Sequence, residues 1–178
     1  MTTDNCMKQV HIITPVKDSI DLTLETARAV LASHWHVPVT YTIYNDFSTD
    51  ENTRRLEEAS QELGFELVNL RDITSHPSPN YLLVLQMAQK RAIEAEAGLL
   101  IVESDVIVRE DTLQGLFDGA LAHPDCGIAA SVTVDEQGTV NYPYLYASDY
   151  PKEACEVKKH CSFCCSLLTL RLLKAFDF

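Results

Sequence analysis

The chain has 178 residues, 46% of them hydrophobic, which is enough to bury the core of one compact α/β domain over residues 1–178. Fourteen Lys and Arg against twenty-six Asp and Glu give a formal net charge of -12, so we expect small-molecule partners and no nucleic-acid binding through a basic face. No apolar stretch is long enough to cross a membrane, and residues 1–9 are polar rather than signal-like, so we expect a soluble cytoplasmic protein.

The first half of the chain alternates expected strands and helices. Strands are predicted where runs are apolar, β-branched or aromatic, at residues 10–13, 39–44, 65–70 and 99–102. Helices are predicted where apolar residues recur at helical spacing, at residues 21–33, about 51–63 and 81–97. Gly64 and Gly98 are expected to end the last two helices. This alternation predicts an α/β fold with a Rossmann-like, doubly wound, mostly parallel sheet flanked by helices.

The second half is less regular. It predicts a helix at about residues 111–122, a strand near residues 127–134, a turn at residues 135–138 and a short strand that includes Val140 and Tyr142. A tyrosine-rich loop follows. Residues 162–170 are apolar with small side chains and lead into the C-terminal segment.

Polar side chains follow three of the expected strands. Thr14 follows the first strand, Asn45 and Asp46 follow the second, and Glu103 and Asp105 follow the fourth. The carboxyl ends of neighbouring parallel strands form a crevice at one edge of the sheet. We therefore expect these side chains to line one pocket.

Asp105 follows a fully apolar strand, where a carboxylate contributes nothing to folding unless it binds something or caps the next segment. Mg²⁺ or Mn²⁺ takes carboxylate oxygens and is bridged by a diphosphate, so a metal here would let an acidic chain hold an anionic nucleotide. The alternative is an ordinary turn in which residues 103–105 cap local amides. Asp46 offers an acceptor to a nucleobase N–H or a ribose hydroxyl, whereas Asp50 is better explained as a helix cap.

These motifs resemble those of family 2 glycosyltransferases, which have the GT-A fold. In that family the first strand ends in a P-V-Y-N type turn, similar to Thr-Pro-Val-Lys-Asp at residues 14–18. The second strand ends in D-D-G-S-T-D, similar to Asn-Asp-Phe-Ser-Thr-Asp at residues 45–50, and the fourth ends in D-x-D, similar to Glu-Ser-Asp at residues 103–105. The resemblance covers nearly the whole chain but only the donor half of the family's domain.

The resemblance implies a hexosyl- or related transferase that binds a nucleotide-diphosphate sugar with Mn²⁺ or Mg²⁺. It implies inverting transfer of the sugar to an acceptor hydroxyl that the sequence does not identify. Asp105 would hold the metal, and Glu103 would serve the ribose. The implied substrate-binding residues are Thr14, Pro15, Asp18, Asn45, Asp46, Ser48 and Glu103.

The chain departs from the family pattern at several positions. Asn45 replaces an Asp, Phe47 replaces a Gly, and Glu103 replaces the first acid of D-x-D. The family's R-N-x-G residues are not recognisable at residues 86–91, which leaves the basic contact to the donor unassigned.

The end of the chain, residues 166–177, resembles the family segment that ends in G-G-F-D-E. In the family an acidic general base follows shortly downstream, and such a base commonly contributes roughly 10²–10⁴-fold in rate. We therefore expect the catalytic base to lie beyond Phe178 and the domain to be truncated on its acceptor side. Self-association through the face exposed by that truncation is expected.

Two other functions stay open at this point. One is a non-catalytic or degenerate donor-binding module of a larger protein, because the base is missing. The other is a nucleotidyltransferase on a related fold, although residues 14–18 contain no glycine for a phosphate loop.

The cysteines are a further candidate site. Four of the six lie within residues 155–165, where Cys161 and Cys164 form one Cys-x-x-Cys. Without a second such pair we interpret them as reduced thiols rather than zinc ligands.

Overall fold

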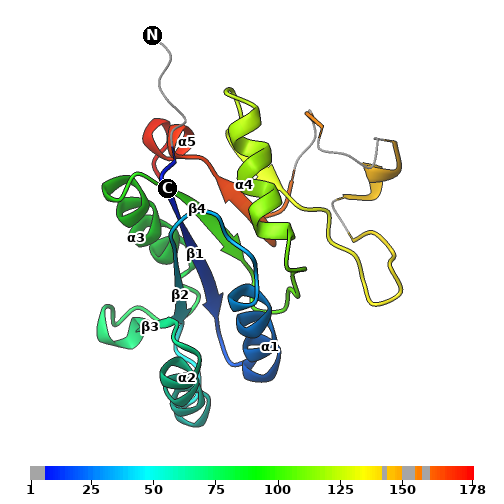
Figure 1. Cartoon of the computed structure of the whole chain (residues 1–178). Coiled ribbons are helices and arrows are strands. Elements are labelled where there is room, and N and C mark those ends of the chain that lie inside the picture. Colours follow the sequence, from blue (N-terminus) through cyan, green and yellow to red (C-terminus); the bar gives the residue numbers. More distant parts are fainter. Residues whose placement is uncertain (1–6, 142–143, 150–154, 158–160) are drawn as a thin grey trace.

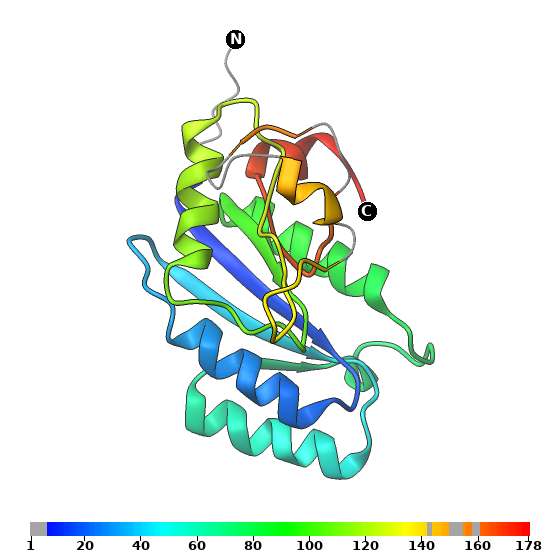
Figure 2. The same cartoon turned by 90° about the vertical axis from the view of Figure 1, so that its right-hand side faces the viewer.

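The computed structural model of the chain describes residues 7–141, 144–149, 155–157 and 161–178. A six-stranded sheet with the order β3-β2-β1-β4-β6-β5 lies between two layers of helices (Figures 1 and 2). Strands β1 to β4 are mutually parallel, and β6 is antiparallel to both β4 and β5. The predicted mostly parallel α/β sheet is therefore confirmed.

The strands are β1 (Gln9–Val16), β2 (Val39–Asn45), β3 (Glu66–Asn69), β4 (Ala97–Val102), β5 (Ile128–Ala130) and β6 (Cys165–Leu168). The helices are α1 (Ile20–Leu31), α2 (Asp50–Leu63), α3 (Tyr81–Glu94), α4 (Thr112–Ala122) and α5 (Leu170–Ala175). Short 3₁₀ helices lie at Leu70–Asp72 and Tyr144–Asp149. Among the described residues, no helix has the length and apolar character needed to cross a membrane.

Two apolar clusters cover the two faces of the sheet. Successive side chains of a strand point to opposite faces, so Val10 and Ile12 of β1 pack beneath α1, α2 and α4, whereas Ile13 packs beneath α3 and α5. Every residue of β4 is buried because helices cover both of its faces. This burial on both faces explains why the sequence of β4 is a continuous apolar run.

β1 continues past the predicted end at Thr14 and Pro15 and stops at Val16. Beyond Ile13 it pairs only with β2, because its pairing with β4 ends where Ile13 lies opposite Ile101. A proline lacks an N–H, and this locally unpaired side of the strand tolerates its absence.

Helix α3 and strand β4 differ from the prediction that α3 extends to residue 97 and is ended by Gly98. The helix ends at Glu94, and Glu96 has a positive φ of 52°, which no helix can continue through. Gly98 lies inside β4, where a Cβ atom would be 2.8 Å from Sδ of Met7 and 2.9 Å from Cδ1 of Leu167. Close packing, not helix termination, explains this glycine. Gly64 does end α2 as predicted, with φ 83°.

The later segments are shorter than predicted. The strand expected near residues 127–134 is limited to β5, and Val134 instead forms an isolated bridge with Val140. That bridge closes the predicted turn at residues 135–138, in which Oδ1 of Asp135 accepts hydrogen bonds from two backbone N–H groups. Tyr142 lies outside the described residues.

His11 is a buried polar side chain in the centre of β1, with an exposed fraction of 6%. Its Nδ1 atom has no hydrogen-bond partner among the described residues. Burial and the nearby Arg91 guanidinium lower the pKa of His11, and the Glu66 carboxylate partly opposes this shift. The folded protein therefore holds His11 as a neutral imidazole.

We expect the free energy of unfolding to fall as the pH drops below about 6.5, the ordinary pKa of histidine in an unfolded chain. The unfolded chain takes up a proton there before the folded one does, so stability is lost by up to about 1.4 kcal/mol per pH unit until the folded-state pKa is reached. Urea unfolding from about pH 8 to about pH 5 measures this slope. His11→Gln should flatten it, whereas His123→Gln, at an exposed position, should not. Equal slopes in the wild type and His11→Gln would contradict the assignment.

Candidate functional site

The loops after β1, β2 and β4 meet at one edge of the sheet. The parallel register places Val16 of β1 opposite Asn45 of β2, and β4 runs in the same direction on the other side of β1. Antiparallel β6 starts at this edge, where the backbone N–H of Glu103 donates to the carbonyl of Cys164 over 2.9 Å. Most of the predicted site residues therefore lie at this edge of the sheet, together with the start of β6, which was not predicted to be there.

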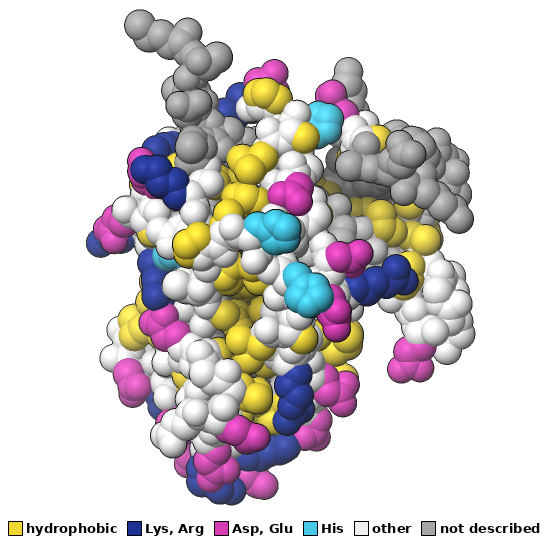
Figure 3. Space-filling model, viewed as in Figure 1, with side chains coloured by type: hydrophobic (Ala, Val, Ile, Leu, Met, Phe, Trp, Pro, Cys, Tyr) yellow, Lys and Arg dark blue, Asp and Glu magenta, His cyan; other side chains and the backbone are white. Residues whose placement is uncertain are grey.

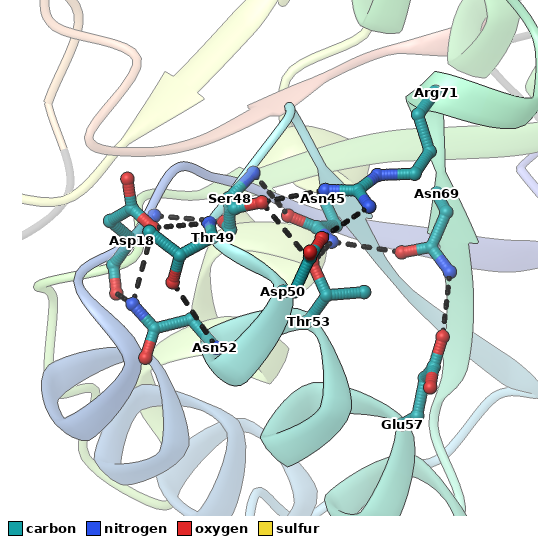
Figure 4. Close-up of polar contacts among 10 residues, drawn as sticks. All are labelled: Asp18, Asn45, Ser48, Thr49, Asp50, Asn52, Thr53, Glu57, Asn69 and Arg71. Carbon is teal, nitrogen blue, oxygen red and sulfur yellow. Dashed lines mark hydrogen bonds and ion pairs between the residues drawn. The ribbon is translucent and has the colours of Figure 1, made fainter.

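Asp18 connects the loop after β1 to the start of α2 (Figure 4). Its backbone N–H donates to Oγ of Ser48 over 2.9 Å, and its Oδ1 accepts from the backbone N–H of Thr49 over 2.7 Å and from Nδ2 of Asn52 over 3.1 Å. These bonds hold Asp18 at φ 64°, a left-handed conformation. The bond from Thr49, followed by that from Asn52, lowers the pKa of Asp18, so this carboxylate is ionised at neutral pH.

Asn45 is the buried centre of the loop after β2, with an exposed fraction of 1%. Its Nδ2 donates to Oγ1 of Thr53 over 2.9 Å and to Oδ1 of Asn69 over 2.8 Å, while its Oδ1 accepts from the backbone N–H of Ser48 (Figure 4). An ionised Asp, the residue of the resembled motif, has no donor for the first two bonds. The substitution of Asn for Asp at this position is explained by this buried network.

Arg71 holds the same loop from the side of β3. Its Nη2 donates to the carbonyl of Ser48 and its Nη1 to Oδ1 of Asp50, each over 2.8 Å (Figure 4). The ion pair with Asp50 contributes little because the side chain of Asp50 is 94% exposed. The bond to Ser48 fixes the loop. Sequence reasoning missed Arg71, because it lies outside the three motifs.

Asp46 joins the loop after β2 to the start of α3. Its Oδ2 accepts from Oγ of Ser78 over 2.7 Å and from the backbone N–H of Asn80 over 2.8 Å, and its Oδ1 accepts from Nδ2 of Asn80 over 2.7 Å. Burial opposes ionisation of Asp46, but these hydrogen bonds outweigh it and lower its pKa. Oδ1 accepts one bond where a carboxylate oxygen accepts two, so acceptor capacity remains. The sequence analysis did not identify Ser78 or Asn80 as residues of the site.

Glu103 and Asp105 lie in the turn after β4, which closes with a hydrogen bond from the N–H of Val106 to the carbonyl of Glu103. Glu103 is half-buried and Asp105 is exposed, and neither forms an ion pair with a described cation. Burial and the charge of Asp105 raise the pKa of Glu103, and a hydrogen bond with Cys164 partly offsets the shift. The two carboxylates repel each other.

Tyr81, in the first turn of α3, lies beside this acidic turn. Its hydroxyl is buried and has no hydrogen-bond partner among the residues that the structure describes. Burial, followed by the charges of Glu103 and Cys164, raises the pKa of Tyr81. The phenol therefore stays protonated and can donate a hydrogen bond.

The remaining predicted residues lie deeper in the fold. Thr14 is fully buried within β1, where its Oγ1 is 2.9 Å from the hydroxyl of Tyr41. Pro15 is half-buried in the same strand, and Ser48 is 2% exposed and bonded to Asp18 and Arg71. In this structure Thr14 and Ser48 use their polar atoms to hold strands and loops together.

The other surfaces offer less. Figure 3 shows Lys and Arg side chains scattered over one face rather than gathered into a basic patch. A cavity of about 410 Å³ lies by α1 and the start of β2, lined mainly by apolar side chains that include Ile12, Trp35 and Tyr41. No group of three or more His, Cys, Asp or Glu within the described ranges could hold a metal by itself.

Comparisons with known proteins identify the fold. No family profile and no curated protein matches the chain. Solved structures do match. S. aureus TarS, residues 1–349, is 18% identical with a TM-score of 0.51, over 67% of this chain and 34% of that one. The mannosyltransferase PcManGT from Pyrobaculum calidifontis is 20% identical with a TM-score of 0.51, over 72% and 36%.

Glucosyl-3-phosphoglycerate synthase from Mycobacterium tuberculosis is 13% identical with a TM-score of 0.50, over 68% of this chain and 42% of that one. A second structure of TarS residues 1–349 is a complex with UDP-GlcNAc. The PcManGT structure is a complex with GDP-Man and Mn²⁺, and the synthase structure is a complex with UDP, Mn²⁺ and glucosyl-3-phosphoglycerate. The chain spans less than half the length of each. Likeness at this identity establishes the fold alone, and the predicted GT-A fold is confirmed.

Phe47 has φ 59°, the left-handed conformation at the position where the resembled motif has Gly. A side chain in this conformation costs about 1–2 kcal/mol. We expect Phe47→Gly to be more stable than Phe47→Ala by about 1 kcal/mol, because both remove the ring and only Gly relieves the backbone. Urea unfolding measures the difference.

The matched control is Leu82, which is exposed within α3. There the order should reverse, with Leu82→Gly about 1 kcal/mol less stable than Leu82→Ala. If Phe47→Ala proved as stable as Phe47→Gly, the backbone at Phe47 would carry no strain.

Proposed function

We propose that the chain is the donor-binding part of a family 2 glycosyltransferase that binds a nucleotide-diphosphate sugar with Mn²⁺ or Mg²⁺. The proposal rests mainly on Glu103 and Asp105, two carboxylates at the carboxyl edge of a GT-A sheet that form no ion pair with a cation in the described part of the chain. A divalent cation relieves their repulsion and adds the positive charge that a diphosphate needs on a chain of net charge -12.

The position in the sheet supports this proposal. The strand order β2-β1-β4 means that the chain proceeds to opposite sides of β1, and doubly wound sheets bind ligands in the crevice at such a switch point. Asp105 lies on the β4 side of that crevice, and Asp18 and Asp46 lie on the β1 and β2 side. We place the metal and diphosphate at Asp105 and the nucleoside near Asp18 and Asp46.

The residues present fit a hard divalent cation. Asp105 offers exposed carboxylate oxygens, the donor type that Mg²⁺ and Mn²⁺ prefer, and Mg²⁺ sites commonly use one or two carboxylates together with substrate phosphates. Bound there, the cation would neutralise charge on the diphosphate leaving group. Glu103, one methylene longer than the Asp of D-x-D, is half-buried and is assigned to the ribose hydroxyls.

The reaction we propose for the whole enzyme is inverting transfer to an acceptor hydroxyl. We assign no general base within residues 1–178. A cytoplasmic location remains a prediction. The donor-binding module without catalysis is the main alternative, and the nucleotidyltransferase is disfavoured because the turn at residues 14–18 contains no glycine.

Calorimetric titration of UDP, GDP and dTDP tests donor binding. We expect at least one of them to bind in the presence of Mn²⁺ and to bind far more weakly without it. Asp105→Asn should weaken the metal-dependent binding by roughly tenfold or more, because a contact to a charged group contributes about 1.5–3 kcal/mol. Asp111→Asn makes the same charge change at an exposed position before α4 and should bind like the wild type. Metal-independent binding, or full binding by Asp105→Asn, would contradict the proposed metal site.

Release of free sugar or of nucleoside diphosphate from the donor, followed by chromatography, separates an enzyme from a binding module. We expect tight donor binding with little turnover from this chain, because no base is assigned within it. Rapid turnover would show that a base lies within residues 1–178. Light scattering on the same sample tests the proposed self-association, which a strict monomer would contradict.

A further inference from the structure

Lys17 directly follows β1, at the crevice between the loop after β2 and the turn after β4. Its side chain is exposed, and its charge acts on both Asp18 and Asp46, but no ion pair is formed with either carboxylate. Arg71 is the other cation in the loops that follow β1, β2 and β3, and it is already bonded to Ser48 and Asp50.

The fold does not depend on Lys17. Asp18 accepts hydrogen bonds from Thr49 and Asn52, and Asp46 accepts them from Ser78 and Asn80, all neutral donors. Oδ1 of Asp46 keeps capacity for one further bond. The bonds of Asp18 also fix the turn at φ 64° that immediately follows Lys17, so the direction in which the chain leaves β1 is set. An exposed cation therefore lies near two hydrogen-bonded acids, at the nucleoside end of the proposed site.

The chemistry of these neighbours indicates what Lys17 contacts. A phosphate within reach of Lys17 would also lie near the carboxylates of Asp18 and Asp46, which would repel it. A neutral nucleobase meets no such repulsion. It can present a ring N–H to a carboxylate and an adjacent carbonyl oxygen to an ammonium, which has three donors and no acceptor.

We propose that Lys17 donates a hydrogen bond to a carbonyl oxygen of the donor's nucleobase, next to the ring N–H that Asp46 accepts. Uracil, thymine and guanine present this N–H and C=O pair, whereas cytosine and adenine present an unprotonated ring nitrogen beside an amino group. Lys17 is therefore a specificity-determining residue that selects the first three bases over the last two. This inference rests on the proposed function, because it requires a nucleotide at this edge.

The test compares the affinities of UDP, GDP, CDP and ADP, each with Mn²⁺, for four forms of the chain. The wild type should bind UDP or GDP at least about tenfold more tightly than CDP and ADP. Lys17→Met, which keeps the length of the side chain without its charge, should reduce this ratio to about threefold or less. Lys90→Met removes one charge from an exposed lysine on α3 and should keep the ratio of the wild type.

Asp105→Asn separates the two proposals. It should weaken all four nucleotides by a similar factor and leave the ratio unchanged, because the metal contacts only the diphosphate that they share. An equal loss for UDP and CDP in Lys17→Met, or no loss for either, would overturn the assignment of Lys17 while leaving the donor site intact. Absence of binding by these four nucleotides and by dTDP to the wild type would overturn the proposed function and this inference with it.

Discussion

Parallel pairing of β1 with both β2 and β4 is the constraint on which the rest of the structure depends. Residues Val10 to Ile13 pair on both sides, and a slip of one residue would turn every side chain of β1 to the opposite face and break both apolar clusters. Because the strands run in one direction, each must be followed by a helix that returns the chain. The loops after them consequently meet at one edge, and the polar residues of these loops become neighbours.

The acids at this edge fall into two groups with different roles. Asp18 and Asp46 are ionised and hydrogen-bonded by neutral donors from other loops, so they fix the shape of the site. Glu103 and Asp105 have no comparable set of donors among the described residues and repel each other, so they gain from a bound cation. Asp18 and Asp46 therefore form a rigid frame, whereas Glu103 and Asp105 carry negative charge that a bound cation can neutralise. This division agrees with a metal-bridged nucleotide held between β1 and β4.

Local signals were sufficient to predict β1 to β4, α1 to α4 and the edge where the polar residues meet, but not β6 or α5. Apolar runs located the first four strands, because a buried strand requires consecutive apolar residues. Gly64 located the end of α2, because a left-handed cap favours glycine. The hydrogen bonds within the site were not predictable from local signals. Asn45 bonds to Asn69 and Asp46 bonds to Asn80, contacts that join separate segments of the chain and depend on how the loops fold together. Gly98 was misassigned for the same reason, since its neighbour Leu167 is remote in sequence.

The central claim is that a metal and a nucleotide bind at the carboxyl edge of the sheet. Nuclear magnetic resonance of the ¹⁵N-labelled chain with saturating UDP or GDP tests it directly, with Mg²⁺ first and then traces of paramagnetic Mn²⁺. The account predicts that Mg²⁺ and nucleotide shift the amide signals around Lys17, Asp46 and Glu103, and that Mn²⁺ broadens those nearest Asp105 most strongly. Signals at Gly64, at the far end of α2, should stay sharp. Broadening centred elsewhere, such as around Trp35 and Gly64 at the apolar cavity, would contradict the account.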